Sequence, residues 1–366
     1  MKRSKPPFRA DHVGSLLRTA AIVEARKKRE GGQISADDLK AVEDREIEEI
    51  IKKQEQTGLQ SITDGEFRRA WWHLDFLERL SGAESFYREQ GVAFHGVQTR
   101  PKGVRVVGKL GFGGHPMIEH FKFVQARTTR TPKMTIPSPT AMHYREGRSG
   151  ISKIIYPDIA EFFHDLGEAY RKAVRAFADA GCRYLQLDEV YLALLCDPEQ
   201  HKILRSQGED PDRLPAIYAE VINRAISDIP SDMTISMHLC RGNFRSTFMA
   251  SGGYEPIADL LFNTLKIHGY FMEYDTERAG GFEPLRFVPK NKTVVLGLVT
   301  SKSGKLERKD DIKRRIDLAA KFVDLDQLAL SPQCGFASTE EGNILAEEEQ
   351  WAKLRMIVEI ADEVWG

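Results

Sequence analysis

The sequence predicts an α/β fold, a (β/α)8 TIM-type barrel with an inserted hairpin or loop region around residues 85–130. Short β-branched or apolar runs alternate with longer amphipathic segments, which is typical of repeated βα units. Eight such runs can be counted, and eight is the number of strands in this type of barrel. A chain of 366 residues is also long enough for one large barrel. We therefore expect residues 1–366 to form one barrel domain rather than two doubly wound sheets.

The predicted strands follow one another in chain order, with helical segments between them. The strands are expected at 9–15, 60–66, 133–139, 183–189, 233–239, 270–275, 293–299 and 327–333. The helical segments are expected at 35–58, 156–181, 211–228, 306–322 and 342–364. The first of these helices has clear ends, because Ser35 can cap its amino terminus, acidic residues fill its first turn and Gly58 follows its last turn.

The stretch 85–130 breaks the alternation of strands and helices. Within it, the run "GVRVVGKLGFGGHP" (103–116) looks like a hairpin that turns at its glycines. We expect this insertion to lie over one face of the barrel.

The composition excludes several classes of protein. The chain has 53 basic and 54 acidic residues, and no block of like charge suggests a nucleic-acid or membrane surface. No apolar run approaches the roughly 20 residues that span a bilayer. The basic start of the chain lacks the apolar stretch of a secretory signal, and four cysteines in a chain of this length indicate a reducing compartment. We expect a cytoplasmic protein that acts on small molecules, and a homo-oligomer is compatible with the sequence.

Metal-binding residue types stand at the ends of three predicted strands, where a barrel carries its functional groups. His238 and Cys240 are two residues apart, so on an extended strand their side chains point to the same side. Cys334 follows the eighth predicted strand, and Glu273 ends the sixth. A His-x-Cys pair alone is more often an ordinary core pair. One imidazole, two thiolates and a carboxylate together favour zinc, since thiolates disfavour magnesium and calcium.

Other strand ends carry polar groups of a different kind. Ser15 follows Gly14, where backbone N–H groups could hold an anion. Acidic pairs follow two further strands, Asp64 with Glu66 and Asp188 with Glu189. Such carboxylates can bind an ammonium group, transfer a proton or cap the next helix, and the sequence leaves these roles open.

These residues together resemble the catalytic barrel of the cobalamin-independent methionine synthase family, especially its short, single-barrel members. The resemblance covers nearly the whole chain in order, through the motifs "RADHVGSLLR", "TDGEFRR", "IPSPTAMHY", "LQLDE", "HLCRGN", "FMEYD" and "LSPQCGF". The spacing of "HLC" and "PQCG" is the most specific of these signals. The resemblance implies a methyltransferase of methionine biosynthesis.

The resemblance also implies roles for individual residues. It assigns zinc to His238, Cys240, Glu273 and Cys334. It assigns homocysteine to Val13, Gly14, Ser15, Glu66 and Asp188, with the two carboxylates on the amino group and the Ser15 turn on the carboxylate. A metal-bound thiol loses its proton at neutral pH, and only the thiolate is strongly nucleophilic. Methyl transfer to the thiol is the expected reaction.

The donor side departs from the family pattern. The position of the family's proton-donor histidine falls at Thr300, a further acidic position falls at Leu194, and the stacking tryptophan is replaced by Tyr144, which can still stack. A methyl group on a folate amine leaves poorly unless the nitrogen is protonated. These departures argue against methyltetrahydrofolate as the methyl donor and raise a methylated corrinoid as an alternative.

Two other functions remain open at the level of sequence. One is a zinc-dependent alkyltransferase that acts on another thiol or electrophile, as in epoxyalkane:coenzyme M transferases. The other is a metal-binding barrel without catalysis.

Overall fold

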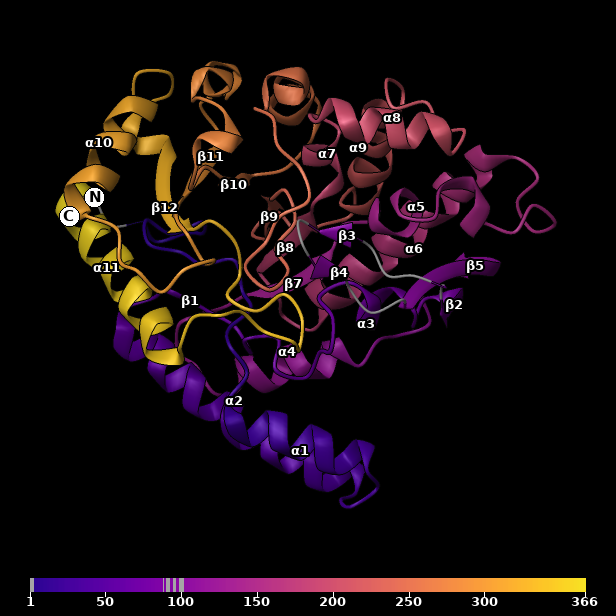
Figure 1. The fold of residues 1–366 in the computed structure, drawn as a ribbon, viewed down its shortest axis with the longest axis horizontal. Helices are drawn as coiled ribbons and strands as arrows, with labels where there is room; N and C mark the ends of the chain where they lie inside the picture. Colours follow the sequence, from indigo (N-terminus) through magenta and orange to yellow (C-terminus); the bar gives the residue numbers. More distant parts are fainter. Residues whose placement is uncertain (1–2, 88, 90–92, 95–96, 99–101) are drawn as a thin grey trace.

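A computed structural model describes residues 3–87, 89, 93–94, 97–98 and 102–366 of the chain. Its centre is a parallel sheet with strand order β12-β11-β10-β9-β8-β7, and helices surround this sheet (Figure 1). The strands are β7 (Met134–Pro137), β8 (Tyr184–Glu189), β9 (Thr234–Leu239), β10 (Gly269–Glu273), β11 (Thr293–Val299) and β12 (Leu328–Pro332). All six lie within the predicted strands to within one residue, and their almost complete burial is typical of parallel barrel strands.

Two short segments close the sheet into a barrel. Ala10 forms a parallel bridge with Leu330 of β12, and the backbone N–H of Leu16 donates to the carbonyl of Gly65. The short strand β1 (Ser61–Ile62) pairs in parallel with β6 (Thr131–Pro132), which leads directly into β7. The predicted (β/α)8 barrel is therefore confirmed.

The first two predicted strands are wrong in extent. The segment 9–15 forms one bridge only, and the segment 60–66 is a strand only at its first residues. Gly14, Gly65 and Glu66 all have positive φ angles, of 140°, 63° and 60°, so the backbone leaves the extended conformation early. The residues that follow form turns at the carboxyl ends of the barrel strands.

The five predicted helices are all present. They are α2 (Ala36–Thr57), α6 (Ile159–Asp179), α9 (Leu214–Ala225), α10 (Lys309–Ala319) and α11 (Glu347–Trp365). Ser35 caps α2 in a reciprocal capping box with Asp38, and Gly58 ends the helix in a left-handed conformation. Further helices that the sequence analysis did not predict are α1 (Ala20–Glu30), α3 (Leu74–Leu77), α4 (Met117–Gln125), α5 (Ala141–Tyr144), α7 (Tyr191–Leu194) and α8 (Pro198–Ser206).

The insertion contains a hairpin, but its turn is not where the sequence predicted it. Strand β2 (Ser81–Tyr87) pairs antiparallel with β5 (Lys102–Gly111), so most of the run 103–116 is one strand. Gly82 has φ of 81°, and a Cβ there would lie 2.4 Å from the carbonyl oxygen of Lys109. The glycines thus allow a bulge and close backbone approach rather than a turn. The short strands β3 (Ala93–Phe94) and β4 (Val97–Gln98) also pair, and the rest of residues 88–101, apart from Glu89, lies outside the described residues.

Among the described residues, no helix combines the length and the apolar character that crossing a membrane requires.

A buried ion pair ties the closing segments of the barrel to its wall. Asp11 accepts hydrogen bonds from the hydroxyls of Ser61, at 2.6 Å, and Tyr184, at 2.9 Å. The Lys133 ammonium group lies 3.5 Å from the same carboxylate, and both side chains are completely buried. One carboxylate thereby joins the first segment to β1, the start of β7 and β8.

We expect Asp11→Ala to lower the free energy of unfolding by about 3–5 kcal/mol, because it leaves the buried Lys133 charge without a counter-ion. Asp326→Ala is the matched control, since Asp326 pairs with Arg9 but its side chain is 79% exposed. Urea-induced unfolding of the two variants measures the difference. Equal stability of the two variants would show that the Asp11–Lys133 pair does not hold the barrel closed.

Candidate metal and substrate site

A pocket lies where the barrel strands end, with about 510 Å³ of space that includes open solvent at its mouth. Its walls come from segments far apart in the sequence, which only the closed barrel brings together. The lining residues are Val13, Ser15, Glu66, Trp72, Arg145, Asp188, Val190, His238, Cys240, Gly242, Asn243, Met249, Cys334, Gly335 and Ser338. Seven of them were predicted from the sequence as site residues. The pocket therefore lies on the face of the barrel where the βα loops start.

Three soft donor atoms converge in this pocket. Potential ligand atoms of His238, Cys240 and Cys334 all lie within 4.8 Å of one another, and all three residues are buried. His238 Nε2 is 3.4 Å from the sulfur of Cys334. His238 belongs to β9 and Cys240 follows its last residue, while Cys334 lies two residues beyond β12.

The turn that carries Cys334 packs against the first barrel segment. A Cβ on Gly335 would lie 1.9 Å from the hydroxyl oxygen of Ser15 and 3.1 Å from its Cβ, so a larger residue there would displace the Ser15 side chain. The backbone N–H of Phe336 donates to the carbonyl of Ser15 at 3.0 Å. The contact fixes the "VGS" turn beside the thiol of Cys334.

The protonation of the two thiols is unequal. The hydrogen bond to Cys334, together with burial, raises the pKa of Cys240 well above its usual value. The same hydrogen bond and the nearby charge of His238 outweigh burial and lower the pKa of Cys334 well below its usual value. Burial works to lower the pKa of His238, but the charge of Cys334, its hydrogen bond to His238 and the charges of Asp188 and Glu273 together raise the pKa. The hydrogen bond between the two thiols thus favours the thiolate form at Cys334 and the thiol form at Cys240.

These donors fit a zinc ion. Ligand atoms of one tetrahedral zinc lie roughly 3.5 to 3.8 Å apart, given the usual Zn–S and Zn–N bond lengths. The His238–Cys334 distance of 3.4 Å is close to this range. Two thiols and an imidazole are also soft and borderline ligands, which zinc prefers over oxygen-binding cations.

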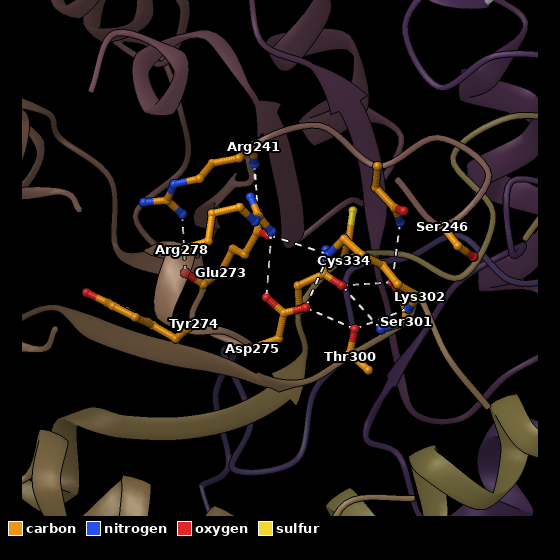
Figure 2. Close-up of polar contacts among 12 residues, drawn as sticks. Arg241, Ser246, Glu273, Tyr274, Asp275, Arg278, Thr300, Ser301, Lys302 and Cys334 are labelled. Carbon is orange, nitrogen blue, oxygen red and sulfur yellow. Dashed lines mark hydrogen bonds and ion pairs between the residues drawn. The ribbon is translucent and has the colours of Figure 1, made fainter. Parts of the chain in front are cut away.

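The fourth predicted ligand, Glu273, lies beside this group but not within it. It ends β10 as predicted and is fully buried, yet its carboxylate is not among the donor atoms that converge. Its Oε2 atom accepts a hydrogen bond of 2.6 Å from the backbone N–H of Arg241, the residue after Cys240. Its Oε1 atom faces Arg278 and Lys302 (Figure 2).

The charge of Glu273 is nevertheless suited to a metal ligand. Burial works to raise its pKa, but the charges of Lys302, Arg278 and Arg241 outweigh burial and hold the pKa below its usual value. Metal-binding carboxyl groups must be ionised. Glu273 therefore needs a change of partners, not of protonation, to bind a cation.

Two further carboxylates face the pocket, Glu66 and Asp188. Glu66 accepts a hydrogen bond of 2.9 Å from Thr135 through Oε1, whereas its buried Oε2 has no partner among the described residues. Burial raises the pKa of Glu66 despite the nearby Arg69. Burial and the charge of Glu66 raise the pKa of Asp188 to about 7. Two buried carboxylates of this kind are suited to a cationic group of a ligand.

The other members of the two acidic pairs, Glu189 and Asp64, fix the local backbone instead. Glu189 accepts hydrogen bonds from the backbone N–H groups of Tyr191 and Leu192 and thus caps α7. Asp64 accepts one from the backbone N–H of Glu66. Of the carboxylates whose roles the sequence left open, Glu189 and Asp64 thus bind backbone N–H groups, whereas Glu66 and Asp188 line the pocket.

Val13 and Ser15 line the pocket, and Gly14 supports them from behind. A Cβ on Gly14 would lie 2.7 Å from the side chain of Thr135, and its φ of 140° is strained for other residues. Gly14 therefore shapes the turn that carries its two neighbours.

Two predicted positions of the donor side lie outside the pocket lining. Tyr144 stacks on Tyr191 with ring centroids 4.7 Å apart, and its hydroxyl donates to Gln200. Thr300 donates to Asp275 at 2.9 Å. Both side chains are engaged with protein groups, so the aromatic contact predicted for Tyr144 is made to another tyrosine.

Several residues of the pocket wall were not predicted from the sequence. Arg145 directly follows Tyr144, and its Nε donates to the hydroxyl of Tyr191 at 2.8 Å. Asn243, within the "HLCRGN" motif, donates to the carbonyl of Gly335 at 3.0 Å. Arg145 follows one of the motifs named above and Asn243 lies within another, and this position was the signal available in the sequence.

The comparisons with known proteins agree with this geometry. Residues 8–363 match the family described as the catalytic domain of cobalamin-independent synthase. The uncharacterized protein YxjH of Bacillus subtilis is 52% identical over all of this chain and 96% of that protein. A solved structure from Listeria monocytogenes, provisionally described as a vitamin-B12 independent methionine synthase, is 42% identical, with a TM-score of 0.81 and full coverage of both chains.

A longer relative is also similar. The 5-methyltetrahydropteroyltriglutamate–homocysteine methyltransferase of Bacillus velezensis is 25% identical over 351 residues, which are 95% of this chain and 42% of that protein.

We expect Cys240→Ser and Cys334→Ser each to lose most of the zinc that the wild-type protein binds, because each variant removes one of three converging donors. Both variants should stay folded, since a core of this size does not depend on one metal ion. Cys196→Ser is the matched control, because Cys196 is buried outside the pocket. Metal analysis and circular dichroism measure the two effects. Full zinc content in either pocket variant would contradict the assignment.

Proposed function

We propose that this chain, which belongs to the family of the cobalamin-independent synthase catalytic domain, transfers a methyl group to the thiol of homocysteine to give methionine. The observation that carries the proposal is the convergence of His238, Cys240 and Cys334 in one pocket with two buried carboxylates. The three soft donors suit a thiol, and the two carboxylates suit an amino group. Homocysteine carries both.

The proposed metal ligands are His238, Cys240, Cys334 and, as the fourth, Glu273. A zinc ion held there would lower the pKa of a substrate thiol, so that a thiolate exists at neutral pH. Two cysteine thiolates and one carboxylate make this ligand set anionic. A negative ligand set favours a sulfur that attacks an alkyl carbon.

The other end of homocysteine is assigned to the walls of the same pocket. Glu66 would accept hydrogen bonds from the ammonium group through its unpartnered Oε2, and Asp188 would add a second negative charge. Ser15, next to the Cys334 turn, would receive the carboxylate. Fixing both ends of the substrate holds its sulfur near the metal ligands.

For the methyl donor we propose a methylated folate. The name of the Bacillus velezensis relative specifies 5-methyltetrahydropteroyltriglutamate, and nothing in the comparisons supports a corrinoid. Trp72 and Met249 give the pocket wall an apolar surface, and Asn243 and Arg145 add polar groups beside it. A flat, polar ring system suits such a surface. Because Thr300 is bonded to Asp275 and lies outside the pocket lining, we assign it no part in proton transfer. The reaction balances because the proton that the homocysteine thiol loses replaces the methyl group on the folate nitrogen, which then leaves as the neutral amine.

We expect the zinc-loaded protein to form methionine from homocysteine and methyltetrahydrofolate, preferably as the triglutamate. Mass spectrometry of the product measures the reaction, and Cys334→Ser serves as the inactive control. Methionine formed only from methylcobalamin would contradict the proposed donor. Transfer to a different thiol, with none to homocysteine, would contradict the proposed acceptor.

We expect kcat/KM for homocysteine to fall as the pH drops below about 7, the pKa to which burial raises Asp188. A carboxylate attracts the substrate ammonium group only when it is ionised, and it is ionised above its pKa. Asp188→Asn should lower kcat/KM roughly tenfold or more at pH 8 and flatten this part of the profile. Glu189→Gln, which alters the neighbouring helix cap, should keep the pH dependence. An unchanged profile in Asp188→Asn would rule out this role for Asp188.

A further inference from the structure

The carboxylate of Glu273 shares two cations with a second buried carboxylate, Asp275 (Figure 2). Lys302 Nζ lies 3.5 Å from Glu273 Oε1 and 3.2 Å from Asp275 Oδ2. Arg278 pairs with Glu273, and the same nitrogen lies 3.9 Å from Asp275 Oδ1. Each cation therefore faces both carboxylates.

Asp275 has one carboxylate oxygen available for these cations, and other contacts hold the residue in place. Its Oδ1 atom is buried and has no hydrogen-bond partner among the described residues. Its Oδ2 atom accepts a hydrogen bond of 2.9 Å from Thr300, and its backbone carbonyl accepts one of 3.3 Å from Arg315. Arg278 could move onto the free oxygen while Asp275 stays where it is.

The charges of this cluster constrain what Glu273 can do. Two carboxylates face Lys302 and Arg278, and the side chains of all four are at most 13% exposed. The charge of Arg241 also acts on Glu273. Taking one carboxylate away from buried cations is strongly unfavourable unless another anion stays with them. If Glu273 joins a cation bound by His238, Cys240 and Cys334, Asp275 is the anion that remains.

We propose that Asp275 is a positioning residue for Glu273. By holding Lys302 and Arg278, it allows the Glu273 carboxylate to exchange these partners for the metal. This inference rests on the metal centre proposed above. It also gives a role to Thr300, whose hydroxyl orients Asp275.

The test is the zinc affinity of a double-mutant cycle on the full-length protein, measured by transfer of zinc from the loaded protein to a chelator of known affinity. Asp275→Asn should weaken zinc binding about tenfold, because Lys302 and Arg278 then retain Glu273. Glu273→Gln should also weaken binding. In the Glu273→Gln background, Asp275→Asn should cause no further loss, because there is no carboxylate left to release.

If Asp275→Asn acted only by removing a negative charge near the metal, it would weaken zinc binding equally in the wild-type and the Glu273→Gln proteins. That result would overturn the proposal while leaving the metal centre intact. An unchanged affinity in Glu273→Gln would remove Glu273 from the metal centre and the proposal with it. Lys302→Gln provides a second measurement should Asp275→Asn fold poorly. It should tighten zinc binding, because one competitor for Glu273 is gone, and weaker or unchanged binding would contradict the proposal.

The matched control is Glu307→Gln. Glu307 accepts a hydrogen bond of 2.9 Å from the backbone N–H of Thr300 but makes no ion pair with Lys302 or Arg278 among the described residues. Its removal takes away a carboxylate next to the same loop, so zinc affinity should stay at the wild-type value. Thermal unfolding of each variant separates loss of folding from loss of affinity. A tenfold loss of affinity in folded Glu307→Gln would show that any nearby charge suffices and would overturn the proposal.

Discussion

The site depends on three soft donor atoms that the closed barrel brings within 4.8 Å of one another. Cys334 lies almost a hundred residues from His238, so no local structure could join them. Closure of the ring through the bridge of Ala10 with Leu330 makes the contact possible, and the fit of Gly335 against Ser15 fixes it. The same contact places the "VGS" turn beside the thiols. Barrel closure, metal donors and the proposed substrate turn are thus one structural feature.

Charge is distributed around this feature in two separate groups. On the pocket side, Glu66 pairs with Arg69 through Oε1 but leaves Oε2 without a hydrogen-bond partner among the described residues, and Asp188 accepts a hydrogen bond from Gln186. Burial raises the pKa of both carboxyl groups. On the other side, Glu273 and Asp275 are balanced by Arg278 and Lys302. The unpartnered oxygen of Glu66 is suited to receive a cationic substrate group. Glu273 and Asp275 share their cations, so one carboxylate can change partners without leaving a buried charge unpaired.

Much of the fold was predictable from local patterns. Hydrophobic runs identified the six central strands, and caps such as Ser35 and Gly58 identified helix ends. The extents of the first two strands and the position of the hairpin turn were predicted wrongly for one reason. The backbone conformation of their glycines cannot be read from the sequence. Gly82 permits close backbone approach, and Gly14 redirects the chain towards the pocket. The i, i+2 spacing of His238 and Cys240 predicted a shared direction. The orientation of Glu273 depends on Arg278 and Lys302, which no spacing rule connects to it.

The proposed function requires that this pocket binds zinc through sulfur and presents it to a substrate thiol. X-ray absorption at the zinc edge, recorded with and without homocysteine, tests it most directly. We expect two sulfur neighbours at about 2.3 Å in the protein alone and one more when homocysteine is added. A zinc environment made only of nitrogen and oxygen, or a sulfur count that homocysteine leaves unchanged, would contradict it.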